Sequence, residues 1–215
     1  MTATCTVVHL LLGLDGGAGP AGSRYDVVSP VLVKSSPDGT PLPVPPAPFD
    51  VLVEVRVPGA EPELSGEVLR AIADALGPEP AVDPERSAVL AGVEHTVIPG
   101  SGTAFAVGLI RRRPDLSRED FVSHWRDRHV ALARRVSGST GYRQLHAVPA
   151  FSTAVAARLG IPDAGFDGAG LMFVADLASM AQVRSTPEVR RDATEDEMQF
   201  VDHARSHFFA VRERR

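Results

Sequence analysis

Strand-like and helix-like segments alternate in a fixed order in the second half of this 215-residue sequence. Residues 103–113 have the apolar content of a strand, and Ser117, with Asp120 three residues later, predicts the start of a helix that runs to about residue 136. Four further segments follow, predicted as a strand, a strand, a helix and a strand: 141–148, 166–176, 177–189 and 203–213. The order is strand, helix, strand, strand, helix, strand.

The first half repeats part of this order. We expect strands at four places: 4–14, 25–33, 49–57 and 87–100. A helix over 63–77 is predicted to end at Gly77. Residues 15–24 are mostly Gly, Ala and Pro, so the first helix of the pattern is missing here. We therefore predict an α+β protein made of two ferredoxin-like βαββαβ repeats, of which the first lacks its first helix.

A proline-rich segment, residues 35–49, interrupts the first half. Each proline fixes φ and removes a backbone donor, so we expect an extended spacer there.

The composition is that of an ordinary globular protein, with 44% hydrophobic residues, 23% charged residues and a net charge of −5. Neither nucleic acid nor an anionic membrane is therefore an expected partner. The longest apolar run, residues 5–14, is far shorter than the roughly 20 residues of a spanning helix. Cys5 is the single cysteine. It excludes an intrachain disulfide, is expected to be structural, and fits a cytoplasmic location.

The basic residues are almost all arginine, since Lys34 is the single lysine among 22. Together with abundant Ala, Gly and Pro, this bias suggests a GC-rich genome. No individual arginine is therefore assigned a role from composition.

A longer motif lies in the predicted helix of the second half. Phe121, Trp125 and His129 follow the spacing F-x-x-x-W-x-x-x-H, and the strand G-Y-R-Q-L-H, which ends at His146, comes after it. Residues 104–213, including the later segment DEMQFVD, resemble the EthD family of the dimeric α/β-barrel superfamily. One departure is Ala131, where the family has proline.

The resemblance implies that the two repeats pack as an intramolecular dimeric α/β barrel. Residues 1–100 would then be a degenerate half, and residues 101–215 an EthD-like half that carries the site. Relatives bind their substrates in the cavity between sheet and helices. The superfamily includes cofactor-free cyclases, isomerases, decarboxylases, dehydratases and monooxygenases as well as haem enzymes, so the fold does not choose the reaction.

The predicted helix has one apolar stripe, formed by Phe121, Trp125, His129, Leu132 and Val136. His129 would point at the sheet, where burial favours a neutral imidazole that can accept a proton. We assign substrate binding to Phe121 and Trp125, with Trp125 as a wall of the cavity. Arg128, at the edge of the stripe, is assigned to binding a carboxylate or phenolate, with a surface salt bridge as the alternative.

The strand at 141–148 has an unusual polar face. Alternation places Tyr142, Gln144 and His146 on one side, and buried polar groups without partners cost about 1–3 kcal/mol each. Such a face is expected to line a cavity. We therefore assign catalytic roles to His129, His146 and Tyr142, and substrate binding to Gln144.

Metal and cofactor motifs are absent from the sequence. His124 and His129 are five residues apart, so on an α-helix they would diverge by about 140°. His203, Arg205 and His207 would share one face of the last strand, as haem ligand, cavity lining or structure. The run GLDGGAG lacks the spacing of a nucleotide-binding loop. We expect no cofactor and no metal.

The function favoured by these residues is that of a cofactor-independent lyase or isomerase that cyclises, dehydrates or decarboxylates an aromatic or polyketide-type intermediate in specialised metabolism. Two alternatives stay open. One is a haem-dependent or cofactor-free oxygenase using the same cavity, and the other is a non-catalytic small-molecule carrier or assembly partner. Because the missing helix could expose an apolar sheet face, a homodimer is a further expectation.

Overall fold

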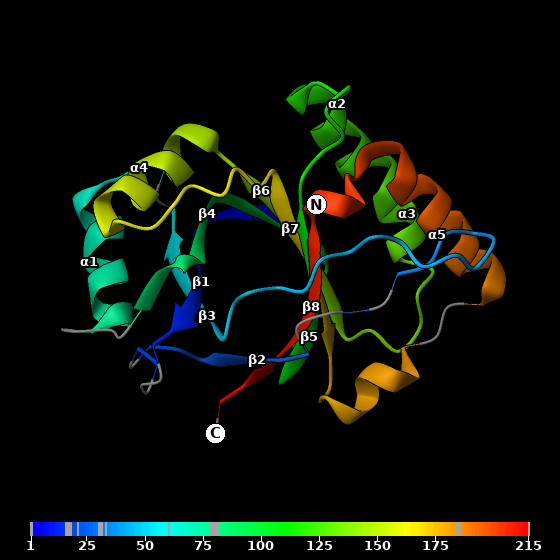
Figure 1. Ribbon diagram of the computed structural model, residues 1–215, viewed down its shortest axis with the longest axis horizontal. Coiled ribbons are helices and arrows are strands. Elements are labelled where there is room, and N and C mark those ends of the chain that lie inside the picture. Colours follow the sequence, from blue (N-terminus) through cyan, green and yellow to red (C-terminus); the bar gives the residue numbers. More distant parts are fainter. Residues whose placement is uncertain are drawn as a thin grey trace.

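Strands of both halves form one sheet in the computed structural model, which describes residues 2–15, 19–20, 22–29, 32, 34–59, 61–77, 82–183 and 186–214. Eight strands in these ranges close into an antiparallel barrel in the order β1-β3-β2-β8-β5-β7-β6-β4 (Figure 1). They are β1 (Thr2–Leu14), β2 (Tyr25–Ser29), β3 (Val51–Pro58), β4 (Val82–Ile98), β5 (Ala104–Ile110), β6 (Gly141–Ala147), β7 (Gly168–Val174) and β8 (His207–Glu213). The helices are α1 (Gly66–Leu76), α2 (Arg118–Ser123), η1 (His124–His129), α3 (Val130–Ala133), α4 (Pro149–Leu159), η2 (Ala178–Gln182), α5 (Pro187–Phe200) and η3 (His203–Arg205).

The predicted fold class, two ferredoxin-like repeats packed as an α/β barrel, is wrong. Hydrogen bonds run without interruption around a single closed sheet, because β2 pairs with β8 and β4 pairs with β6. Side-chain alternation predicts which face of a strand is buried, but it does not say which strand lies beside it. The sequence pattern therefore predicted the strands, but not the pairings that close them into one barrel.

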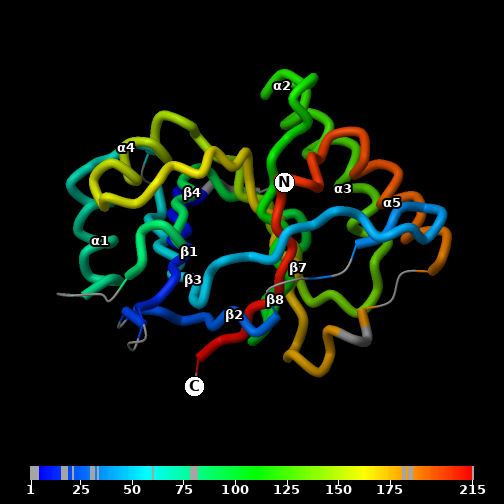
Figure 2. Tube along the Cα trace, viewed as in Figure 1, coloured from blue at the N-terminus to red at the C-terminus, as the bar shows by residue number. Residues whose placement is uncertain are grey.

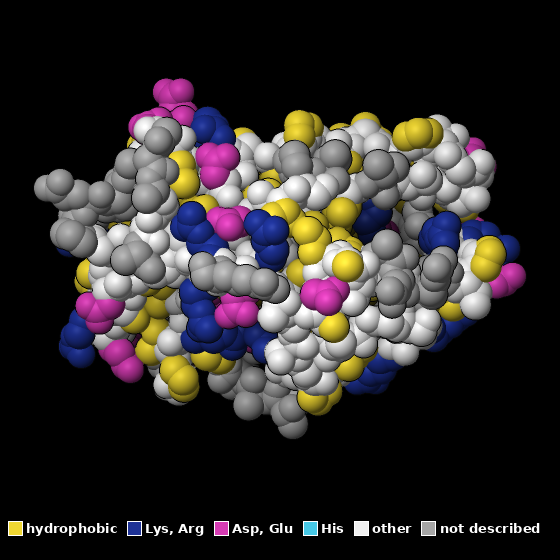
Figure 3. All heavy atoms as spheres, turned by 90° about the horizontal axis from the view of Figure 1, so that it is seen from below, with side chains coloured by type: hydrophobic (Ala, Val, Ile, Leu, Met, Phe, Trp, Pro, Cys, Tyr) yellow, Lys and Arg dark blue, Asp and Glu magenta, His cyan; other side chains and the backbone are white. Residues whose placement is uncertain are grey.

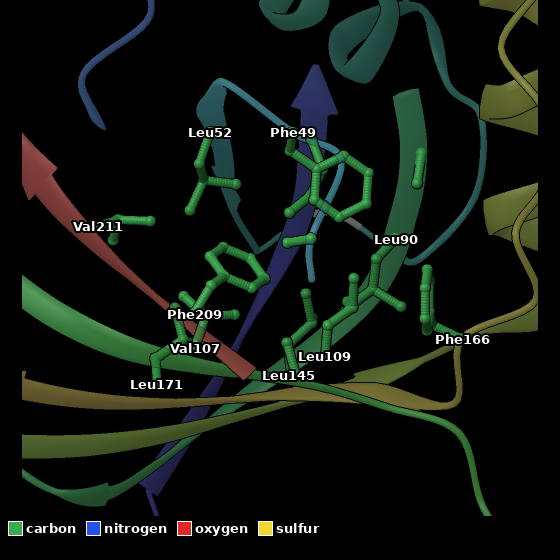
Figure 4. Packing of buried hydrophobic residues seen from close by; sticks show 14 of the residues in the cluster. Phe49, Leu52, Leu90, Val107, Leu109, Leu145, Phe166, Leu171, Phe209 and Val211 are labelled. Atoms are coloured by element: carbon green, nitrogen blue, oxygen red, sulfur yellow. The ribbon is translucent and has the colours of Figure 1, made fainter. Parts of the chain in front are cut away.

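The inside of the barrel is filled by side chains. Figure 4 shows Phe49, Leu90, Leu145 and Phe209 pointing toward one another from strands and loops around the barrel. All four are at most 5% exposed. An eight-stranded barrel has an interior just wide enough for such packing, so we expect a ligand site on its outer face.

Two helices, α1 and α4, lie together on the outer face of β1, β3 and β4 (Figure 1). The hydroxyl of Ser152 in α4 accepts a hydrogen bond from the Ala91 amide and donates one to the Ala91 carbonyl, both at 3.0 Å. Helix α4 thus covers a face that the missing helix of the first half was expected to leave exposed. The observation that motivated a homodimer is therefore not found.

The other helical layer, made of η1, α3 and α5, covers the outer face of strands β5 to β8 (Figure 1). A segment of the first half crosses this layer (Figure 2). We call residues 34–44 the strap. A β-bridge between Ser35 and Pro41 closes a turn in it, and Leu32, just before it, donates its amide to the Phe208 carbonyl at 2.6 Å. The predicted spacer is therefore part of the layer.

Several local predictions are confirmed. The Ser117 hydroxyl accepts the Asp120 amide at 3.0 Å and begins α2, and Gly77, at φ 74°, ends α1. The last strand is shorter than predicted, since His203 and Arg205 lie in η3 and only His207 lies in β8. These three residues therefore do not share a strand face. Within the described ranges, every helix is too short or too polar to traverse a lipid bilayer.

Candidate functional site

A cavity of about 780 Å³ lies between the C-terminal helical layer and the sheet. Its walls come from β5 to β8, η1, α3 and α5, and the strap adds part of the rim. The size falls within the range of small-molecule sites, about 300–1,000 Å³. The polar side chains in its walls include Lys34, His129, Tyr142 and Glu197.

Glycines keep the sheet side of this layer open. Gly108 of β5 is paired with Gly170 of β7. A Cβ atom at Gly170 would lie 3.2 Å from the Tyr142 hydroxyl oxygen, and one at Gly168 would lie 2.5 Å from the Trp125 ring. The two aromatic side chains therefore rest directly against bare backbone.

His129 is oriented by a carboxylate of α5. Its Nδ1–H donates to Asp196 at 2.8 Å, and His124 Nε2–H donates to the other oxygen of Asp196, also at 2.8 Å. Burial opposes ionisation of Asp196, but the hydrogen bonds from His129 and His124 outweigh it and lower the pKa of this carboxyl. Among the described residues, the Nε2 atom of His129 has no hydrogen-bond partner.

The predicted divergence of His124 and His129 is wrong. Residues 124–129 form a π-helix, η1, within the helix that was expected to be α-helical throughout. Because a π-turn closes with i→i+5 hydrogen bonds, residues five apart come to the same side. Both imidazoles therefore reach Asp196.

Tyr142 presents its hydroxyl at the cavity with two donors already on its oxygen. The Trp125 indole N–H donates to it at 3.3 Å, and the Gln144 amide donates at 3.5 Å. Burial raises the pKa of Tyr142 to about 12, although these hydrogen bonds oppose the rise. The phenol is therefore neutral at physiological pH, and its proton is free to be donated to a ligand.

His146 lies behind Tyr142 and does not line the cavity. Its Nε2–H donates to the Gln144 carbonyl oxygen at 3.1 Å, and its ring stacks on Trp125 with 5.0 Å between centroids. Burial, with the neighbouring His95 as a smaller cause, lowers the pKa of His146 to about 3. No described contact joins His129 and His146.

Gln144 is held in one orientation by its neighbours. Its amide NH₂ donates to the Trp125 carbonyl at 3.3 Å, and a carbonyl can only accept. Its side-chain oxygen must then face His146, which donates to it. The hydrogen bonds therefore run in one direction, from His146 to Gln144 and from Gln144 to the phenol oxygen of Tyr142.

An ion pair joins the strap to α5 inside the cavity. Lys34 Nζ lies 2.9 Å from each carboxylate oxygen of Glu197, and His203 Nε2–H donates to the same carboxylate at 3.4 Å. Burial alone would raise the pKa of Glu197, but the Lys34 ammonium and the His203 N–H hold it below the usual range. His203 does not itself line the cavity, but it contacts two residues that do, Glu197 and Phe208, on whose ring it stacks with 5.8 Å between centroids.

The remaining predicted residues lie outside the cavity. Phe121 is fully buried against Trp125 and Phe200. Arg128 is exposed and does not reach the cavity. His207 donates Nδ1–H to the Pro45 carbonyl at 3.2 Å and does not line the cavity either.

Three groups of the site were missed in the sequence: Lys34 and Glu197, which line the cavity, and Asp196, which binds His129. The two acids stand in the DEMQFVD segment, whose likeness to the family was noted without a role. Lys34 is the single lysine of the chain, and that rarity was the available signal. No group of three or more His, Cys, Asp or Glu side chains in the described ranges could hold a metal ion.

Comparison with known proteins identifies the second half. Residues 113–204 match the model of the EthD domain. This segment of the chain is similar to an EthD domain. The predicted family is therefore confirmed, whereas the tandem arrangement is not. The matched residues include Trp125, His129, Tyr142, Asp196 and Glu197 of the cavity and its surroundings.

Two solved structures are similar over nearly the whole chain. One is a putative monooxygenase from Lactobacillus acidophilus, with 9% identity, a TM-score of 0.48, and coverage of 98% of this chain and 94% of that chain. The other is a haem-binding protein from Thermus thermophilus, with 14% identity, a TM-score of 0.45, and coverage of 99% of this chain and 93% of that chain. None of the curated proteins compared with the chain matches it. At these values the likenesses assign no activity.

Proposed function

We propose that this EthD-domain protein is an enzyme that removes a proton from an aromatic or polyketide-type small molecule in the cavity. The observation that carries the proposal is the position of His129. Its Nδ1 is bound to Asp196, its Nε2 has no partner among the described residues, and its side chain lines a largely apolar cavity that also presents the Tyr142 phenol.

The two groups have complementary roles. His129 accepts the substrate proton at Nε2, and the Asp196 carboxylate stabilises the imidazolium that forms. Tyr142 donates its proton in a hydrogen bond to the substrate oxygen on which negative charge develops. Its two other partners, Trp125 and Gln144, donate to it and so cannot accept that proton in place of the substrate.

His146 takes a positioning role in this proposal, although the sequence suggested catalysis. It contacts Trp125 and Gln144, which lie between it and the Tyr142 hydroxyl. Its neutral imidazole fixes the Gln144 amide and, through it, the direction in which the Tyr142 proton points.

The step after deprotonation decides the reaction class. The anion can eliminate water, close a ring or lose carbon dioxide, which gives the lyase or isomerase reaction. An electron-rich anion can instead react with oxygen, which gives a cofactor-free oxygenase. A carrier would bind the same molecule with no step at all.

One observation also favours the haem alternative. The free Nε2 of His129, backed by Asp196 on Nδ1, is an arrangement that iron-binding imidazoles share with catalytic bases. An absorption spectrum of the purified protein separates the two. A Soret band in the wild-type protein that disappears in His129→Gln would assign His129 as an iron ligand. If wild-type protein prepared with added haem shows no Soret band, this role is excluded.

The proposed base is tested with 2-tetralone, a neutral bicyclic ketone with acidic C–H groups. In D₂O, wild-type protein should accelerate deuterium exchange measured by NMR. His129→Gln should reduce the acceleration by about 10²–10⁴-fold, and Tyr142→Phe by about 10²-fold. His207→Gln, a histidine outside the cavity, is the matched control.

Exchange that is equally fast in His129→Gln and wild type would contradict the proposal. So would a wild-type protein that binds 2-tetralone without accelerating its exchange. Oxygen consumption during the same incubation distinguishes an oxygenase from a lyase or isomerase.

A further inference from the structure

The charged groups around the cavity are unevenly balanced. Among the described residues that line it, Lys34, Arg190 and Arg191 stand against the single acid Glu197. Arg191 is itself paired with Asp192 at 3.4 Å and Glu195 at 4.0 Å outside the cavity. Lys34 and Arg190 are therefore the cations that outnumber Glu197 there. The chain as a whole has a net charge of −5. On the face shown in Figure 3, basic and acidic side chains are interspersed. A positive cavity on an acidic protein favours an anionic ligand.

Lys34 is the basic group whose ammonium is fixed within the cavity. Its Nζ lies 2.9 Å from both oxygens of Glu197 and 4.6 Å from the centre of the Phe208 ring. The side chain is 28% exposed. An ammonium group has three N–H donors. Two of them are directed at Glu197, so the third can be donated to a ligand.

A ligand carboxylate would compete with Glu197 for the ammonium group of Lys34. Glu197 is itself held by His203 at 3.4 Å, so its carboxylate keeps a second donor if Lys34 turns toward a ligand. A bound carboxylate would therefore share Lys34 with Glu197, and would not leave Glu197 without a partner. Removal of the Glu197 charge should strengthen the binding of such a ligand.

We propose that Lys34 binds the carboxylate of an aromatic or polyketide-type acid and thereby selects acidic substrates for this cavity. The inference rests on the proposed function, because it names the substrate class of the same site. The cation comes from the strap, which belongs to the first half of the chain, whereas His129 and Tyr142 come from the second half. The site is therefore assembled from both halves.

The test compares two probes with the same ring system, anthraquinone-2-carboxylate and its uncharged methyl ester. Trp125 is the single tryptophan and lines the cavity, so quenching of its fluorescence measures binding. Wild-type protein should bind the acid at least about tenfold more tightly than the ester. In Lys34→Met this ratio should fall to about 1, and in Glu197→Gln it should rise above that of wild type.

The alternative is that the ion pair only fastens the strap to α5. In that case Lys34→Met and Glu197→Gln would weaken acid and ester alike, and the proposal would be overturned. It would also be overturned if wild-type protein bound the acid no better than the ester. Arg135→Met is the matched control, because it removes another ion pair to α5, the exposed contact with Asp192 at 3.1 Å.

The experiments distinguish failure of the proposed reaction at His129 from failure of the proposed carboxylate binding by Lys34. His129→Gln should leave the ratio of acid to ester binding unchanged, since Lys34 acts on the charge of the ligand. If 2-tetralone exchange did not depend on His129 but the ratio still depended on Lys34, only the proposed reaction would be lost.

Discussion

The two helical layers of this barrel cover two parts of its single sheet in opposite ways. On the N-terminal side, Ile72 of α1 and Phe151 of α4 pack with strand residues such as Leu10 and fill the space above β1, β3 and β4. On the C-terminal side, η1, α3 and α5 leave a cavity of about 780 Å³. The same sheet thus supports a solid layer and a hollow one.

The difference begins at single positions on the strands. Where β1 has Leu10 on its outer face, β5 has Gly108 and β7 has Gly170. A strand with small residues cannot fill the layer above it, so the helices there must be held by other contacts. In the hollow layer these contacts are polar, such as His129 with Asp196 and Lys34 with Glu197.

The largest expected effect comes from removing a large side chain in each layer. Leu10→Ala should destabilise the protein by about 2–5 kcal/mol, because Leu10 is fully buried in packed surroundings. Leu132→Ala should cost less than about 1 kcal/mol, because Leu132 borders the cavity. Urea unfolding measures both. Equal costs would mean that the two layers are equally packed.

A second comparison adds the same atoms to each layer. Ala91→Leu, in the filled layer, should destabilise by about 1–3 kcal/mol, because no space is available for the larger side chain. Ala106→Leu should be nearly neutral for stability, because Ala106 faces the cavity. If Ala106→Leu proved the more destabilising variant in the same unfolding experiment, the C-terminal layer would have no space beside Ala106 for a larger side chain.

A smaller effect concerns the polar floor of the hollow layer. The folded pKa of His146 is lowered to about 3, so the unfolded chain takes up its proton first as the pH falls below about 6.5. Its stabilising contribution is present above that pH and is lost progressively as the pH falls toward 3. Between pH 7 and pH 5.5 the wild type should lose about 1 kcal/mol more than His146→Gln.

Urea midpoints at the two pH values, measured for both proteins, check this difference. Identical pH dependence would show that His146 is not buried in its neutral form. The hydrogen bonds that link His146, Gln144 and Tyr142 would then be arranged differently.

Local features of the chain could be predicted from sequence. The Ser117 cap, the Gly77 stop and the polar face with Tyr142, Gln144 and His146 depend on neighbours a few residues away, and all are found in the structure. Helix α4 also carried a local signal, since Pro149 begins it and Gly160 follows its end. That signal was overlooked.

The missed features are not local. Lys34 and Glu197 are 163 positions apart, and only the path of the strap brings them together. Barrel closure depends on the pairing of β2 with β8, for which no residue pattern exists. The π-turn at residues 124–129 widens one helical turn without a Gly or Pro to mark it, so the approach of His124 to His129 could not be foreseen.

The most direct measurement is a fluorescence titration of Trp125 with anthraquinone-2-carboxylate in wild-type protein, Ala106→Leu and Ala91→Leu. If the hollow layer is the ligand site, Ala106→Leu should lose binding by about tenfold or more, while folded Ala91→Leu should bind as the wild type does. Unchanged binding in Ala106→Leu would place the ligand elsewhere and would contradict the account.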